Sequence, residues 1–178
     1  PDVDAIIRSV ARRQRQMWIR ASAGPDPDKL WSMALLSHRR PKRTVKAELL
    51  RAWAAEMAGI DAWILEESYH VVGDLAGTIA LVLPEPEASS EKSLTEWITV
   101  VEQLAAYDED GKRTAVTDAW RVLGTTERYL FNKLITGSFR VGVSQKLMTR
   151  ALSQATEIDE LNHAHRLIGN WTPHTNGL

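Results

Sequence analysis

The sequence predicts an all-α fold, a single domain of about nine or ten helices. Apolar residues recur three or four positions apart along most of the 178-residue chain, which is the spacing of helices with one buried face. No segment alternates apolar and polar residues over the length of a strand. Capping residues and glycines stand at the borders of the periodic segments, where helices begin and end.

The periodic segments give the expected helices in order. They are 4–20, 27–36, 44–58, 62–70, 72–82, 94–107, 112–123, 126–136, 143–155 and 157–168. Ser93 and Glu96 have the spacing of a capping box. Thr156 and Asp159 repeat that spacing, and Asp61 can cap the helix that follows it. Glycines follow three of the runs, where a left-handed residue often ends a helix. They are Gly59, Gly124 and Gly169.

The seven tryptophans are scattered along the chain. Most of them fall at apolar positions of the expected helices, so we expect them to lie in the core. They are Trp18, Trp31, Trp53, Trp63, Trp97, Trp120 and Trp171.

The composition is that of an ordinary globular protein, with 44% hydrophobic and 25% charged residues. The chain has no cysteine, which excludes a disulfide framework, a cysteine nucleophile and thiolate metal sites, and suits a reducing cytoplasm. No apolar run is long enough to span a bilayer and no signal peptide is visible, so we expect no membrane partner. The chain begins at Pro1 and not at methionine, so we expect its native start to be missing.

The net charge of −1 hides an uneven distribution. Residues 1–60 carry a net +6, residues 61–110 a net −11 and residues 111–178 a net +4. A polyanion can bind across the two basic blocks if the fold brings them together. The alternative is that surface charges cluster by chance.

The segment 84–93 is the one clear linker, and an internal repeat lies on either side of it. Its sequence, PEPEASSEKS, is polar and rich in proline, and it divides the chain into two lobes without making independent domains. Residues 31–54 align without gaps to residues 130–153 at an offset of 99. Each copy reads as a helix, a Ser or Thr, a short basic loop and a second helix. This pattern predicts a pseudo-twofold pair of helical hairpins.

The basic loop of the first copy is a candidate phosphate site. Its six residues are His38, Arg39, Arg40, Pro41, Lys42 and Arg43. The loop immediately precedes a helix expected to begin near Thr44, whose N-terminus would present N–H donors and whose threonine would add a hydroxyl. The alternative is a solvated basic loop with no ligand.

The matching loop of the second copy is the second candidate. It runs from residue 136 to residue 146, with glycines that allow close backbone approach, two cations and several neutral donors. A nucleotide-binding glycine-rich loop is the rival interpretation. Gly137 and Gly142 have the spacing Gly-x-x-x-x-Gly, but Gly142 is followed by Val-Ser and not by Lys-Ser or Lys-Thr, and no strand precedes the loop. A duplex phosphate backbone fits better than a nucleotide.

Residues 67–74 place Ser68, His70 and Asp74 close together, which invites comparison with a hydrolase triad. Triad partners normally come from separated segments, and no Gly-x-Ser-x-Gly elbow is present. A buried polar junction between two helices is the favoured interpretation. The histidines do not share a helix face or a spacing that would hold a metal ion, so no metal site is expected.

Three stretches resemble the N-terminal domain of bacterial ATP-dependent DNA ligases. They are HRRPKRTVKAELLRAWAAEMAG, WILEESYHVVGDLAGTIALVLP and LFNKLITGSFRVGVSQKLMTRAL, in the order that the family has them. The last also resembles the Thr-Gly-x-x-Arg-x-Gly loop of the wider eukaryotic and archaeal ligase family. The resemblance covers the chain from about residue 28 to about residue 173.

The resemblance implies an all-helical domain that binds nicked double-stranded DNA across the minor groove, mainly through phosphates. Such a domain helps the adenylation and OB-fold domains of the same chain close around the nick. Matching positions carry the DNA-binding role onto Thr136, Gly137, Ser138, Arg140, Gly142, Ser144, Gln145 and Lys146. The role extends to the first loop, at Arg39, Arg40, Lys42, Arg43 and Thr44.

The ligase reaction attaches AMP to a lysine in a Lys-x-Asp-Gly motif, which this sequence lacks. The chain also stops where the family runs on toward the catalytic domain. We therefore expect a fragment with no catalytic residue and no cofactor of its own, whereas ATP and Mg²⁺ are expected for the full-length ligase. The resemblance implies a bacterial cytoplasmic protein, associated with the nucleoid through DNA. The alternative is a helical protein–protein scaffold without a nucleic-acid role.

Overall fold

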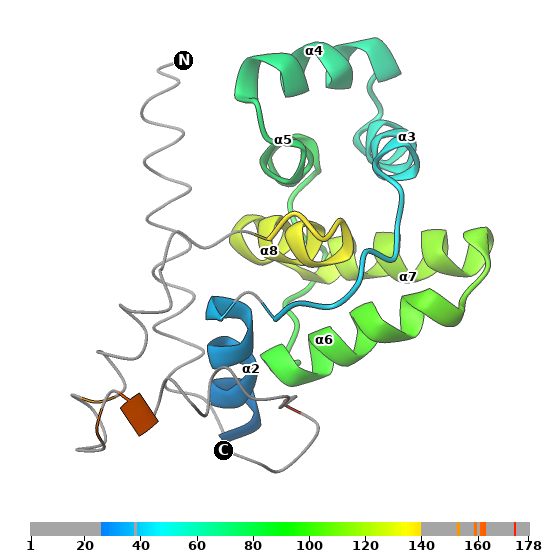
Figure 1. The fold of residues 1–178 in the computed structure, drawn as a ribbon. Helices are drawn as coiled ribbons and strands as arrows, with labels where there is room; N and C mark the ends of the chain where they lie inside the picture. Colours follow the sequence, from blue (N-terminus) through cyan, green and yellow to red (C-terminus); the bar gives the residue numbers. More distant parts are fainter. Residues whose placement is uncertain are drawn as a thin grey trace.

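The computed structural model describes residues 26–37 and 39–139, together with a few isolated positions nearer the C-terminus. Within these residues the chain forms seven α-helices, one short 3₁₀ helix and no strand (Figure 1). The all-α class is confirmed. The helix count differs from the expected nine or ten, and three expected segments lie wholly or largely outside the described residues. They are 4–20, 143–155 and 157–168.

Helix α8 lies at the centre of the described helices (Figure 1). It packs against α5 on one side and α6 on another, while α4 and α3 cover α5 and α2 packs on α6. The elements are α2 (Asp26–Leu36), α3 (Ala47–Ala58), α4 (Ala62–Val72), α5 (Leu75–Val82), α6 (Leu94–Gln103), η1 (Leu104–Ala106), α7 (Glu109–Val122) and α8 (Thr125–Ile135). None of these helices is long and apolar enough to cross a bilayer.

Two of the expected helix ends are confirmed. The Ser93 hydroxyl accepts a hydrogen bond from the Glu96 N–H at 3.3 Å, and the Glu96 carboxylate accepts one from the Ser93 N–H at 2.7 Å. This reciprocal pair is the expected capping box at the start of α6. Gly59 ends α3 in the left-handed conformation, with φ of 65°.

Two other expected helix ends are corrected. Gly124 has φ of −69° and does not end α7; it is the N-cap of α8, and its N–H donates to the Glu127 carboxylate at 2.9 Å. Asp61 stands at the N-cap of α4, but its side chain makes no capping hydrogen bond. In both cases the residue type marks a helix border, but only the structure shows which group forms hydrogen bonds with the backbone N–H groups there. Thr156 and Gly169 lie outside the described residues.

A buried polar network joins α7 to α8. The indole N–H of Trp120, which is fully buried, donates to the Asn132 side-chain oxygen at 2.8 Å. The guanidinium of Arg128, also buried, donates to the Trp120 carbonyl at 2.7 Å and to the Pro84 carbonyl at 2.6 Å. Burial lowers the pKa of Arg128, and the nearby charge of Glu85 acts in the opposite direction.

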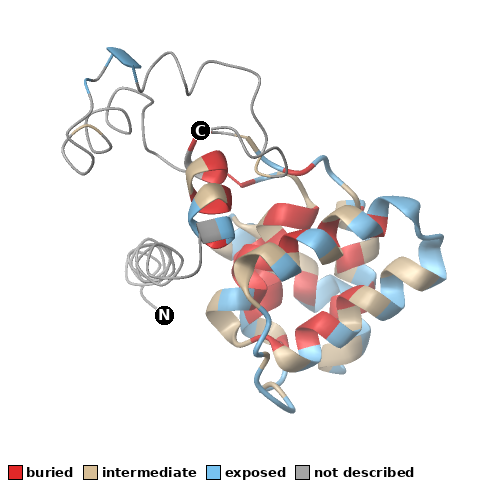
Figure 2. Cartoon of the chain, turned by 90° about the horizontal axis from the view of Figure 1, so that it is seen from below, coloured by how far each residue is buried: buried red, intermediate tan, exposed pale blue. Residues whose placement is uncertain are grey.

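This network corrects the expectation of two lobes divided at 84–93. The start of the linker is held through the Pro84 carbonyl, and the Glu87 N–H donates to the Arg121 carbonyl at 2.8 Å. The segment therefore lies along the packed helices and does not separate them. Buried residues from both sides of the linker form one core cluster, and Figure 2 shows buried positions on the inner faces of the packed helices.

The expectation of a tryptophan-rich core holds for three tryptophans and fails for Trp63. Trp31, Trp53 and Trp120 are buried, and Trp97 is half-buried. Trp63, on the outer face of α4, is 66% exposed. Trp18 and Trp171 lie outside the described residues.

The first prediction concerns stability. Replacing Trp120 by alanine should lower the free energy of unfolding by about 3–5 kcal/mol, because it leaves a cavity and removes the donor to Asn132. Urea denaturation measures the change. Trp63→Ala is the matched control, and its exposed position should keep the change within about 0.5 kcal/mol. Equal losses in the two variants would contradict the assigned core.

Candidate nucleic-acid interface

The basic loop between α2 and α3 is hydrogen-bonded to the C-terminal end of α8. The N–H groups of Thr44 and Val45 donate to the carbonyl of Ile135 at 3.0 and 3.3 Å. Ile135 is the last residue of α8, so no N–H group of the helix is placed to donate to its carbonyl. Figure 1 shows the α2–α3 connection passing beside α8. Two segments about ninety residues apart in sequence are therefore held together by hydrogen bonds to one carbonyl.

Arg40 adds a side-chain contact between the same two loops. Its Nη1 donates to the carbonyl of Phe139 at 2.7 Å, across the 99-residue offset of the sequence repeat. The two loops that the repeat aligns are thus adjacent in space. The second helix of the later copy lies outside the described residues, so the pseudo-twofold relation stays a prediction.

Three cations of the first loop keep a positive charge that no described carboxylate neutralises. Arg40, Lys42 and Arg43 are exposed, and none of them forms an ion pair with a carboxylate in the part of the chain that the structure describes. Arg40 donates to a carbonyl, and the Arg43 Nε donates to the Val45 carbonyl at 3.1 Å. Carbonyl acceptors orient a guanidinium without cancelling its charge. Arg39 is half-buried, and Pro41 between the cations is buried.

Helix α3 begins at Ala47, three residues later than expected. Its N-cap is Lys46, and no side chain caps it. We expected the Thr44 hydroxyl to be a donor at this helix end. In the structure it points instead to the Ile135 carbonyl, at 3.5 Å. The backbone donors of Thr44 and Val45 bind α8, which delays the start of the helix. The uncapped first turn of α3 still presents N–H groups beside the basic loop.

The second loop begins with a Schellman motif at the end of α8. Gly137 has φ of 64°, and its N–H donates to the Leu134 carbonyl at 3.1 Å. The Ser138 N–H donates to the Lys133 carbonyl at 3.1 Å, which completes the motif. A Cβ added to Gly137 would lie 3.4 Å from the Cβ of Arg43. The left-handed backbone therefore favours glycine here, and the short distance to Arg43 leaves little room for a larger side chain.

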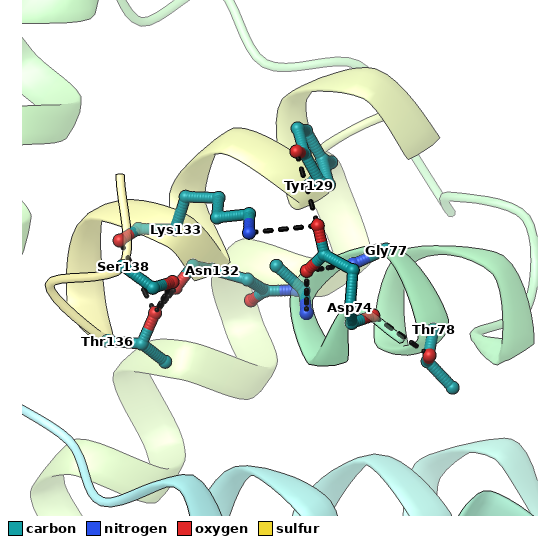
Figure 3. Close-up of polar contacts among 9 residues, drawn as sticks. Asp74, Gly77, Thr78, Tyr129, Asn132, Lys133, Thr136 and Ser138 are labelled. Carbon is teal, nitrogen blue, oxygen red and sulfur yellow. Dashed lines mark hydrogen bonds and ion pairs between the residues drawn. The ribbon is translucent and has the colours of Figure 1, made fainter. Parts of the chain in front are cut away.

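Two hydroxyl groups stand together on this turn. The Thr136 hydroxyl lies 2.7 Å from the Asn132 carbonyl and 2.7 Å from the Ser138 hydroxyl (Figure 3). Since a carbonyl can only accept, Thr136 donates to Asn132 and Ser138 donates to Thr136. Ser138 is exposed, so its hydroxyl can turn toward an outside acceptor such as a phosphate oxygen.

Lys133 is a cation near the second loop that is not available to a phosphate. Its Nζ lies 2.8 Å from the Asp74 carboxylate, which also accepts from the Tyr129 hydroxyl at 3.3 Å (Figure 3). Burial, followed by the charge of Asp74 and this hydrogen bond, raises the pKa of Tyr129, so the phenol stays protonated. Asp74 also caps α5 through the Ala76 N–H at 3.0 Å. Sequence reasoning placed Asp74 at a polar helix junction but missed its partners on α8.

The 67–74 segment does not form a hydrolase triad. The Ser68 hydroxyl donates to the Ile64 carbonyl of its own helix at 2.8 Å. His70 has a 65% exposed side chain, and its nearest carboxylate is Glu66, at 3.5 Å. The expectation of a buried polar junction is correct for the half-buried Asp74 and wrong for His70, which faces outward.

Six candidate residues of the two loops lie outside the described part of the chain, and their expected roles stay predictions. They are His38, Arg140, Gly142, Ser144, Gln145 and Lys146.

The second prediction tests the close contact of the two loops. Gly137→Ala and Gly59→Ala both force alanine into a left-handed backbone, which should cost about 1–2 kcal/mol each. A Cβ at residue 59 meets nothing within 4 Å, whereas one at residue 137 meets Arg43. We therefore expect Gly137→Ala to lower the free energy of unfolding more than Gly59→Ala does in urea denaturation. An equal loss of unfolding free energy in the two variants would mean that Arg43 does not restrict a side chain at residue 137.

Comparison with known proteins identifies the family. The family model described as DNA ligase N terminus matches residues 3–153, well over half of the chain. A search of curated proteins finds no match. The matched range includes every helix described above and both basic loops. This chain belongs to the family of DNA ligase N-terminal domains.

Proposed function

We propose that this chain is the DNA-binding domain of a bacterial ATP-dependent DNA ligase and that it binds nicked duplex DNA irrespective of sequence. The two basic loops contact the phosphate backbone along the minor groove. Phosphate contacts supply affinity and register without reading bases, which suits an enzyme that seals nicks in any sequence during repair, replication or recombination. In the cell the domain acts in the cytoplasm, at the nucleoid, with the catalytic domains of its own chain as partners.

One observation carries the proposal. Arg40, which pairs with no carboxylate among the described residues, donates to the Phe139 carbonyl and so joins the cationic loop to the Thr136–Ser138 turn. The cations, an uncapped helix N-terminus and an exposed hydroxyl then occupy one region of the surface. These are the groups with which proteins bind phosphates.

The chemistry of ligation belongs to the catalytic domains. This sequence has no Lys-x-Asp-Gly motif to accept AMP. Within the described residues, no group of three or more His, Asp or Glu side chains is placed to hold a metal ion. We propose that ATP and Mg²⁺ bind elsewhere in the full-length enzyme and that this domain binds DNA without them.

The third prediction is the salt dependence of DNA binding. If the domain neutralises about four to six phosphates, log K should fall against log salt with a slope of about −4 to −5. Fluorescence anisotropy of a labelled nicked duplex, titrated at several KCl concentrations, gives the slope. Duplexes of unrelated sequence should bind equally well. A flat dependence would favour a helical protein–protein scaffold instead.

The fourth prediction concerns one exposed cation. Lys42→Ala should weaken binding to all duplex sequences and make the salt slope less negative by about 1, since one phosphate contact is lost. Arg113→Ala is the matched control, because Arg113 is an exposed cation of α7 that already pairs with Glu56. If both variants bind like the unmodified domain, the first loop does not contact DNA.

A further inference from the structure

A second surface of the molecule has the properties of a peptide-binding groove. It lies between the 89–92 segment, α6, the η1 corner and α7, and encloses about 630 Å³. Its apolar lining comes from two stripes at helical spacing: Trp97 and Val100 on α6, and Ala115, Ala119 and Val122 on α7. All of these except Ala119 are only half-buried. Helices α6 and α7 meet at the η1 corner (Figure 1), and side chains of both helices line the groove.

The rim of the groove is acidic. Glu91, Glu96 and Asp118 line it, against Lys92 as the single cation. The Asp118 carboxylate forms an ion pair with the Arg121 Nη1 at 2.7 Å. The Lys92 Nζ lies over the Trp97 ring, 4.9 Å from its centroid. The 89–92 wall and α6 belong to the 61–110 block, whose net charge is −11.

The groove is held open by contacts outside it. Arg121 fixes the linker through its carbonyl, which accepts from the Glu87 N–H, and through its Nε, 3.7 Å from the Glu87 carboxylate. The Ser93–Glu96 capping box sets the direction in which α6 leaves the linker. A ligand therefore meets a groove that is already formed, which reduces the entropy lost on binding.

We propose that this groove binds a basic amphipathic helix from a partner protein. An amphipathic helix lays apolar side chains, three or four residues apart, into such grooves, as in other helix-in-groove complexes. The apolar floor takes those side chains, and Glu91, which forms no ion pair within the described residues, pairs with a flanking Lys or Arg. The inference goes beyond DNA binding and does not depend on it, because it uses none of the residues of the two basic loops.

The test uses a fluorescein-labelled amphipathic peptide of leucine and lysine, about 18 residues long, which makes five helical turns. Anisotropy near physiological salt should show binding to the full chain. The same peptide with glutamate in place of lysine should not bind. Glu91→Lys should weaken binding about five-fold or more, because it reverses a rim charge. Glu67→Lys, an exposed carboxylate on α4, is the matched control and should stay within about two-fold.

A second variant tests the apolar floor. Ala115→Trp should fill the groove and abolish binding, while Thr114→Trp, on an exposed face of the same helix, should not. If Ala115→Trp fails to fold by circular dichroism, the Glu91→Lys comparison decides alone. Equal binding of the acidic peptide would overturn the proposal. So would weaker binding of duplex DNA by Ala115→Trp, which assigns the groove to nucleic acid, or a dimer that Glu91→Lys dissociates, which assigns it to a second copy.

Discussion

The carbonyl of Ile135 is the acceptor on which the arrangement of the two basic loops depends. It receives the N–H groups of Thr44 and Val45, at a helix end where the backbone carbonyls lack partners within the helix. Ile135 and Val45 are both buried, so these hydrogen bonds exchange little with water and an unmade one would be costly. The first loop therefore has one position on α8, and Arg40 reaches Phe139 from that position.

Helix α8 serves as the frame because each of its faces is fixed to a different element. Asn132 and Arg128 bind α7 and the linker through Trp120 and Pro84, and Lys133 binds the α5 cap at Asp74. These contacts are half-buried or buried, and they lie within the three turns that precede Gly137. The position of the Thr136–Ser138 turn is thus set by residues that themselves contact no outside ligand. The Schellman motif transmits that position to the start of the second loop.

Sequence periodicity and capping chemistry predicted the seven described helices and the capping box at Ser93, because these signals act within one or two helical turns. These signals could not predict the features that depend on hydrogen-bond partners far away in the chain. The start of α3 moved to Ala47 because Thr44 and Val45 donate to α8, ninety residues on. No sequence signal marked Arg128 as buried, and its burial depends on the Trp120 and Pro84 carbonyls, to which its guanidinium donates. The repeat at offset 99 did place the two candidate loops in correspondence, and the Arg40–Phe139 bond shows them in contact.

The partners of the arginines separate structural cations from those suited to an external anion. Arg51, Arg113 and Arg121 each form an ion pair with a glutamate or an aspartate, so a carboxylate of the fold already compensates their charge. Arg40 and Arg43 instead donate to backbone carbonyls, which fix the direction of the guanidinium and leave its charge in place. Orientation without neutralisation is what an exposed phosphate-binding arginine requires, since a carboxylate partner would have to be displaced before a phosphate could bind. Three carboxylates, of Glu91, Glu96 and Asp118, line the α6–α7 groove instead, so the charges there are opposite in sign to those of the first loop.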